Sequence, residues 1–156
     1  MIRASKGHWF RVLVLWFGLY QAAHFACCIL SFLGAIDFPP PPPSGSWDTH
    51  VRALWEVMGV LDFVLVLVSG VFVAGSLLGR PWAAWVGVVG ITGGLYSGLT
   101  FGYICLATGA TAEHAVEHCA ITLAYAPVLV LYAWLCLLVH RRLAAASPAS
   151  GPGART

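Results

Sequence analysis

The sequence predicts an all-α membrane protein whose four transmembrane helices form a single bundle. Of its 156 residues, 60% are hydrophobic and 9% are charged, a composition too apolar for a soluble domain. A helix needs about 20 residues to cross the hydrocarbon core, and four apolar stretches reach that length: Phe10–Leu33, Ala53–Leu78, Trp82–Ala107 and Cys119–Val139. We expect residues 1–9 to precede the bundle, residues 10–142 to form it, and the Ala/Ser/Pro/Gly-rich residues 143–156 to be a disordered tail.

Basic residues predict the orientation of these spans. They gather before the first span, in the turn between the second and third, and after the fourth: Arg3, Lys6, Arg11, Arg80, Arg141 and Arg142. Because cytoplasmic loops carry an excess of Lys and Arg, both termini and the Arg80 turn are expected in the cytosol. The net charge of +2, without an aromatic-basic patch, argues against a nucleic-acid partner.

The first span has a polar side. Tyr20, Gln21 and His24 recur at helical spacing, so this side should face protein or water rather than lipid. His24 is open to two interpretations, as a hydrogen-bonded packing residue or as part of a ligand pocket. In the loop that follows, Pro39–Pro43 are expected to form a stiff polyproline spacer.

Two carboxylates lie within the second span. A carboxylate in hydrocarbon costs at least about 3 kcal/mol, so it normally faces a protein interior or a wet cavity. Glu56 follows Arg52 by four residues and could pair with it on one helix face. Asp62 lies six residues further on and projects from a different side, so the two acids are not expected to form a catalytic dyad. For both acids, the alternative to a pocket role is a helix–helix contact.

A ridge of small residues runs along the third span. Glycines recur there at every fourth position: Gly90, Gly94, Gly98 and Gly102. Such a ridge lets another backbone approach closely, and that backbone belongs either to the same chain or to a second protomer in a homodimer. Thr100 adds a polar group to this helix.

The start of the fourth span contains a possible metal motif. The residues from His114 to His118 match the H-x-x-E-H pattern of some zinc peptidases. No third ligand is evident, and acids at a helix start are favoured by the macrodipole in any case, so neither a metal nor another cofactor is expected. Further along, Pro127 frees the carbonyl of Leu123, which predicts a kink or a polar notch beside Tyr125.

Taken in order, these pieces resemble the EXPERA-domain family, most closely its sigma-2 receptor branch, which is related to the emopamil-binding sterol isomerase. The matching residues extend over most of the chain from Arg11 to Arg142: Gly18-Leu19-Tyr20 followed by His24, then Glu56, then Glu113-x-x-x-Glu117 leading to Tyr125-Ala126-Pro127. The resemblance implies four helices around a pocket open to the bilayer, in an endoplasmic-reticulum protein that binds sterols or cationic amphiphiles. It places the second-helix acid of that pocket at Glu56, whereas Phe32 stands where the family has its first-helix acid.

The leading hypothesis is a non-enzymatic binder of a sterol or related lipid, with a role in sterol trafficking or homeostasis. Its candidate ligand-binding residues are Tyr20, His24, Glu56, Asp62, Thr100 and Tyr125. One alternative is a sterol Δ8–Δ7 isomerase, in which a buried acid and a base would shift a double bond. The acidic tryptophan- and tyrosine-containing motif of the isomerase branch is missing from the first loop, which favours binding. The other alternative is a structural accessory subunit of a membrane complex, held by the glycine ridge.

Overall fold

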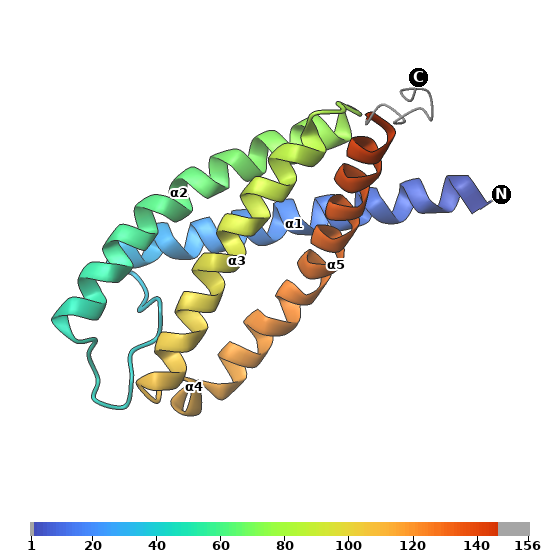
Figure 1. Cartoon of the computed structure of the whole chain (residues 1–156). Coiled ribbons are helices and arrows are strands. Elements are labelled where there is room, and N and C mark those ends of the chain that lie inside the picture. Colours follow the sequence, from blue (N-terminus) through green and yellow to red (C-terminus); the bar gives the residue numbers. More distant parts are fainter. Residues whose placement is uncertain (1, 147–156) are drawn as a thin grey trace, which may run out of the picture.

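The structure is a computed structural model that describes residues 2–146, and this part of the chain is helical apart from its connecting loops (Figure 1). The helices are α1 (Ile2–Phe32), α2 (Thr49–Leu77), α3 (Ala83–Ala107), α4 (Ala110–Glu113) and α5 (Ala115–Ala146). Four of them, all but α4, are long and apolar enough to cross a membrane, and the described residues contain no strand. The predicted all-α architecture with four membrane-length helices is therefore confirmed, while the cytosolic placement of the termini stays a prediction.

The outer ends of the first and last helices differ from the predicted spans. Helix α1 begins at Ile2, and α5 continues to Ala146. Alanine is the best helix former, which explains why α5 extends into the segment expected to be a tail. Residues 147–156, the rest of that tail, lie outside the described residues. At 1.5 Å per residue, the 31 residues of α1 and the 32 residues of α5 each span roughly 45–50 Å. Both are longer than the roughly 30 Å hydrocarbon core, so they project from it or tilt.

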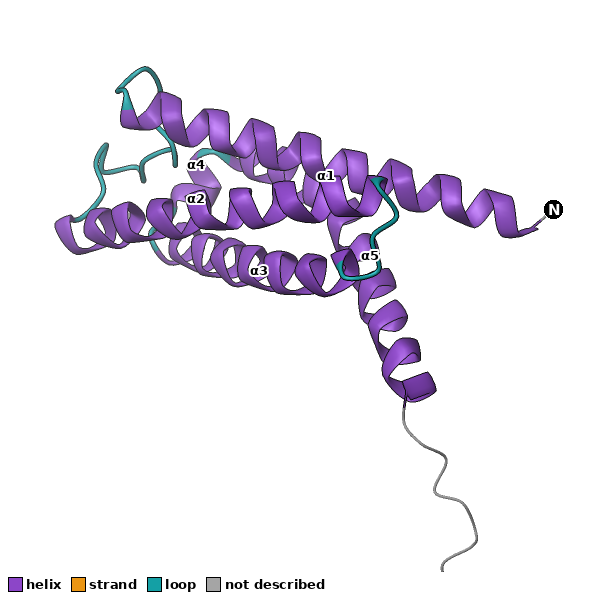
Figure 2. Ribbon diagram, turned by 90° about the horizontal axis from the view of Figure 1, so that it is seen from above, coloured by secondary structure: helices purple, strands orange, loops and turns teal. Residues whose placement is uncertain are grey.

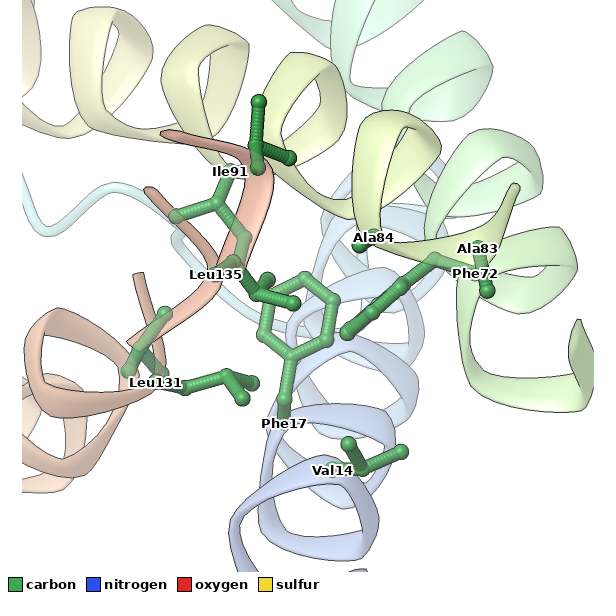
Figure 3. Close-up of a cluster of buried hydrophobic side chains, with 10 residues drawn as sticks. Val14, Phe17, Phe72, Ala83, Ala84, Ile91, Leu131 and Leu135 are labelled. Atoms are coloured by element: carbon green, nitrogen blue, oxygen red, sulfur yellow. The ribbon is translucent and has the colours of Figure 1, made fainter. Parts of the chain in front are cut away.

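The four long helices are arranged in a ring, in which α1 packs on α2, α2 on α3, α3 on α5, and α5 on α1 (Figures 1 and 2). The best-packed region lies toward the end of the bundle that carries the α2–α3 turn. There the rings of Phe17 and Phe72 meet edge to face with centroids 5.7 Å apart, and both side chains are buried (Figure 3). The rest of this core consists of Val14, Ala83, Ala84, Ile91, Val128, Leu131, Leu135 and Val139.

The α2–α3 turn is tight, as the residues Gly79-Arg80-Pro81 predict. Gly79 has a φ of +69°, the left-handed conformation that commonly ends a helix. The backbone N–H of Arg80 then donates to the carbonyl of Gly75 at 2.8 Å, which closes the last turn of α2. From the end of α5, the guanidinium of Arg142 donates to the carbonyl of Pro81. The turn therefore fixes three helix ends at one place.

Glycines do provide close helix contacts, but largely not those of the predicted ridge. A Cβ at Gly98 or Gly102 would meet nothing within 4 Å, so half of the ridge faces open space. On α3 the closest approaches are at Gly87, where a Cβ would lie 2.6 Å from the ring of Phe72, and at Gly93, where it would lie 2.5 Å from Leu65. Whether the open half of the ridge contacts a second protomer stays a prediction.

Gly87→Ala is expected to destabilise the bundle by about 1–3 kcal/mol, the range typical of overpacking. The added methyl group would also lie 2.8 Å from Leu135, so two buried side chains must move. Thermal unfolding in detergent measures the effect. Gly98→Ala is the matched control, and it should leave stability unchanged or raise it by up to about 1 kcal/mol, because alanine is the better helix former. Equal unfolding temperatures for the two variants would contradict this packing.

The proline segment, expected to be a stiff polyproline spacer, also packs against the helices. Pro42 is buried, and the indole of Trp47 donates to the carbonyl of Pro39 at 3.1 Å. The ring of His114 donates from Nε2 to the carbonyl of Pro41 at 3.2 Å. The loop between α1 and α2 therefore packs across the end of the bundle opposite the α2–α3 turn, where it reaches the start of α5. Backbone carbonyl groups of its prolines accept the hydrogen bonds from Trp47 and His114, and the composition alone does not predict these contacts.

Candidate functional site

A polar cluster forms around Asp62, at the middle of α2. One carboxylate oxygen, Oδ2, lies 3.3 Å from Nε2 of His24 on α1. The other, Oδ1, accepts a hydrogen bond of 3.0 Å from the hydroxyl of Ser97 on α3. The sulfur of Cys28, one turn along α1, lies 3.7 Å from the same His24 nitrogen. These four residues, here called the Asp62 cluster, join three helices.

The Asp62 cluster is partly enclosed. The side chains of His24 and Asp62 are 27% and 17% exposed. The ring of Phe38, at the start of the proline segment, meets the His24 ring edge to face with centroids 5.9 Å apart. With His24 protonated, the contact to Asp62 is an ion pair, which lowers the cost of holding a carboxylate at this depth. The cluster therefore presents a partly exposed carboxylate at the middle of the bundle.

The geometry argues against nucleophilic catalysis by Cys28. In a catalytic triad the two imidazole nitrogens serve different partners, one facing the nucleophile and the other facing the acid. Here a single nitrogen, Nε2 of His24, faces both Cys28 and Asp62. Cys, His and Asp are adjacent, but they do not form a relay.

A second layer of polar contacts fixes the helices next to the cluster. The amide of Gln21 donates to the hydroxyl of Ser69 at 2.9 Å, and Ser69 is only 1% exposed. The rings of Tyr20 and Tyr125 meet edge to face with centroids 5.3 Å apart. A Cβ at Gly94 would lie 3.5 Å from the Tyr125 hydroxyl, so this glycine leaves room for the tyrosine. Together these contacts determine how α1, α2, α3 and α5 are rotated around Asp62.

Pro127 does not break α5, which continues through it to Ala146. The polar notch expected at the Leu123 carbonyl, which Pro127 leaves without its usual donor, stays a prediction. The indole of Trp16 donates instead to the neighbouring carbonyl, that of Ala124, at 2.9 Å, and this bond links α1 to α5.

An apolar groove lies next to the cluster, on the outside of the bundle. It lies between α2 and α3, has a volume of about 200 Å³, and is lined by Met58, Leu61, Val64, Leu65, Gly93, Tyr96 and Ser97. Leu61, Val64 and Tyr96 are exposed, so the groove opens on the surface that faces lipid. Ser97 both lines this groove and donates to Asp62. Ser97 therefore lies between the groove and the partly exposed Asp62, which is not itself among the residues that line the groove.

The structure separates the two acids of the second span. Asp62 has two partners, whereas Glu56 is exposed and makes neither a hydrogen bond nor an ion pair with the side chains described, those of residues 7–146. Arg52 is exposed as well, so the expected Arg52–Glu56 pair is not formed. Six residues of helix rotate a side chain by about 240°, and α1 and α3 pack on the side that carries Asp62. The acid at the centre of the site is therefore Asp62 rather than Glu56.

Of the other predicted site residues, His24 belongs to the cluster, and Tyr20 and Tyr125 lie beside it as an edge-to-face pair. Thr100 does not take part, because its hydroxyl donates to the carbonyl of Tyr96 in its own helix at 2.9 Å.

Two cluster members were not predicted. Cys28 lies four residues after His24, and extending the polar side of α1 by one turn would have included it. Ser97 gives no such signal, because its role depends on how α3 is rotated against α2.

The histidines of the H-x-x-E-H pattern are used elsewhere. His114 donates to the proline segment, and His118 stacks on Phe101 with ring centroids 5.5 Å apart. Within residues 2–146 no three His, Cys, Asp or Glu side chains are placed to hold a metal ion together. In this part of the chain, the motif therefore serves to pack the loop-covered end of the bundle.

No protein-family model, no curated protein and no solved structure matches this chain.

Proposed function

We propose that this chain is a non-enzymatic membrane protein that binds a sterol or a related lipid, including cationic amphiphiles. The polar end of the ligand would contact the Asp62 cluster, and its apolar body would lie in the α2–α3 groove. The observation that carries this proposal is the position of Ser97, which lines the groove and hydrogen-bonds to Asp62. Small-molecule sites are typically apolar with a few placed polar groups. Residence in the endoplasmic reticulum and a role in sterol homeostasis are part of the proposal, supported by the EXPERA resemblance.

Asp62 has the chemistry to hold either a hydroxyl or an ammonium group. An ionised carboxylate offers about four lone-pair sites, and His24 and Ser97 use two of them. A sterol hydroxyl could donate to the remaining capacity, and a protonated amine could add a charge-assisted hydrogen bond. An acid kept at mid-membrane depth despite its cost is itself a functional indication.

The ligand would enter from the bilayer rather than from the aqueous loop side. The proline segment packs over that end of the bundle, and its Pro42 is buried. The groove, by contrast, opens toward lipid. Its volume of about 200 Å³ is below the roughly 300–1,000 Å³ of pockets that enclose a whole ligand. We therefore expect the groove to hold one end of the ligand while the rest lies along exposed side chains of α2 and α3.

The same contacts favour binding over isomerisation. Shifting a double bond requires a proton donor and a proton acceptor placed at different positions along the substrate. Here the two titratable groups of the site, His24 and Asp62, are 3.3 Å apart and contact each other. This arrangement suits one polar group of a ligand better than two separated carbon atoms.

Asp62→Asn is expected to weaken retention of the native ligand by about 10–100-fold. The loss of one charge-assisted hydrogen bond, about 1.5–3 kcal/mol, corresponds to that factor. The measurement is lipid extraction and mass spectrometry of protein purified in mild detergent. Glu56→Gln removes the same charge from the same helix at an exposed position and should leave the lipid profile of the wild type unchanged. The proposal fails if Asp62→Asn also leaves the profile unchanged, or if Glu56→Gln causes the same loss.

A further inference from the structure

The charges of the chain are divided between the two ends of the bundle. The end with the α2–α3 turn carries Arg80, Arg141 and Arg142, and Arg11 on α1 lies toward it. None of the six acids lies there: Asp62 is at the middle of α2, and the others are in or near the proline loop, the start of α2, α4 and the start of α5. This end of the bundle therefore attracts anions.

A groove on α5 begins at this basic end. It has a volume of about 400 Å³ and is lined by Val130, Ala133, Trp134, Leu137, Leu138 and Arg141. These positions recur every three or four residues, so they form one stripe on one face of the helix. The ring of Phe10 on α1 lies against Trp134 with centroids 5.7 Å apart. On the opposite face of this segment Leu135 and Val139 are buried, whereas Val130, Ala133 and Leu137 are exposed, so the described chain leaves most of the stripe open. The end of α5 then projects from the bundle (Figure 2).

The length of the stripe matches one leaflet of a bilayer. From Val130 to Arg141 a helix rises about 16 Å, which is roughly half of a 30 Å hydrocarbon core. If Val130 lies near the midplane, Arg141 lies at the level of the lipid headgroups. The stripe is apolar along its length and cationic at its outer end. It therefore matches a phospholipid, whose acyl chain is apolar and whose headgroup is negative.

We propose that this groove binds an anionic phospholipid of the leaflet at the basic end, with the lipid phosphate on the guanidinium of Arg141 and one acyl chain along the stripe. Arginine is suited to phosphate because its planar fork can donate two parallel hydrogen bonds. The neighbouring Arg142 is already engaged by the carbonyl of Pro81, whereas Arg141 lines the groove. Basic pockets on transmembrane helices are typical sites for anionic headgroups.

The lining favours a lipid over a partner helix. Helices that associate in membranes usually meet through small residues that allow close backbone approach. This stripe instead presents leucines, a valine and a tryptophan, with Ala133 as its one small residue. A flexible acyl chain can follow such a surface, and the charge at its end then selects the headgroup.

The test is native mass spectrometry of the full-length protein in detergent, titrated with phosphatidylserine or with phosphatidylcholine. Wild-type protein should retain phosphatidylserine in preference to phosphatidylcholine. Arg141→Gln should lower phosphatidylserine binding about fivefold, the factor expected for one cation at a membrane surface. Arg142→Gln removes the same charge one residue away, and it should change binding less than about twofold, because its side chain is held by the turn.

A second variant tests the groove itself. Ala133→Trp keeps every charge but fills the apolar stripe, so it should also reduce phosphatidylserine binding. Equal losses in Arg141→Gln and Arg142→Gln would show diffuse attraction without a site and would overturn the proposal. No loss in Arg141→Gln, full binding in Ala133→Trp, or a protein dimer in place of the lipid adduct would overturn it as well. These outcomes are independent of the Asp62 site, which Asp62→Asn tests separately.

Discussion

Phe72→Ala is expected to lower the free energy of unfolding by about 3–5 kcal/mol, the range measured for buried aromatic truncations. The Phe72 side chain is fully buried, stacks against Phe17 and lies over Gly87 (Figure 3). Lipid tails are as apolar as the core, so transfer out of solvent contributes little to helix association in a membrane. The loss would come from the cavity and from missing van der Waals contacts, and we expect a value near the lower end of the range.

The measurement is unfolding of the purified protein in detergent, by heat or by a denaturing co-detergent. Phe32→Ala is the matched control, because it makes the same chemical change at a side chain that is 92% exposed at the end of α1. Its effect should be within about 0.5 kcal/mol of zero, as for other surface substitutions. If the two variants were equally destabilised, the cluster around Phe72 would not be the centre of packing in this bundle.

The four spans could be predicted because the signal for a membrane helix is local. About 20 apolar residues in a row suffice, whatever the rest of the chain does. The tight turn at Gly79 could be predicted because its signal is also local. Glycine readily adopts the left-handed conformation that ends a helix, and here it stands directly before Arg80-Pro81. The helix ends were predicted less accurately, because outside the hydrocarbon core nothing in the apolar pattern marks where α1 begins or α5 ends.

The site was only partly predictable because it depends on the rotation of each helix. His24, Tyr20 and Tyr125 were found from the scarcity of polar residues in spans. The choice between Glu56 and Asp62 depends on which face of α2 meets α1 and α3, and a single sequence does not fix that rotation. The same limit applies to Ser97, which becomes part of the site only through its register against Asp62.

Close helix packing was predicted correctly in kind, but within the described chain only Gly90 and Gly94 of the predicted ridge contact other helices. A regular four-residue ridge suggests one continuous contact. Packed helices cross at an angle, however, so a straight stripe on one helix meets its partner over only part of its length. Gly87 and Gly93 lie where Phe72 and Leu65 of α2 approach α3, whereas Gly98 and Gly102 lie beyond that region. The regularity of the pattern was therefore less informative than the position of each glycine relative to the crossing.

The contact between His24 and Asp62 has a structural and a functional interpretation, and a double-mutant cycle distinguishes them. His24→Leu and Asp62→Leu are each expected to destabilise the bundle by about 1–3 kcal/mol, because each leaves the other group, and in the second case also Ser97, without its partner. The double variant should be more stable than the sum of the two effects predicts, by about 0.5–3 kcal/mol of coupling, since no orphaned charge remains. Both groups are partly exposed, which places the expectation below the values for fully buried pairs.

The decisive comparison is between stability and ligand retention in that double variant. If the two residues were no more than a bridge between α1 and α2, replacing both with leucine would recover the unfolding temperature and leave the co-purified lipid unchanged. If Asp62 holds the polar end of a ligand, the double variant recovers stability but not the lipid, because leucine offers no acceptor to a hydroxyl or an ammonium group. We expect the second result. Since the groove would remain intact, the loss of lipid from a well-folded double variant would assign recognition to the carboxylate rather than to the shape of the bundle.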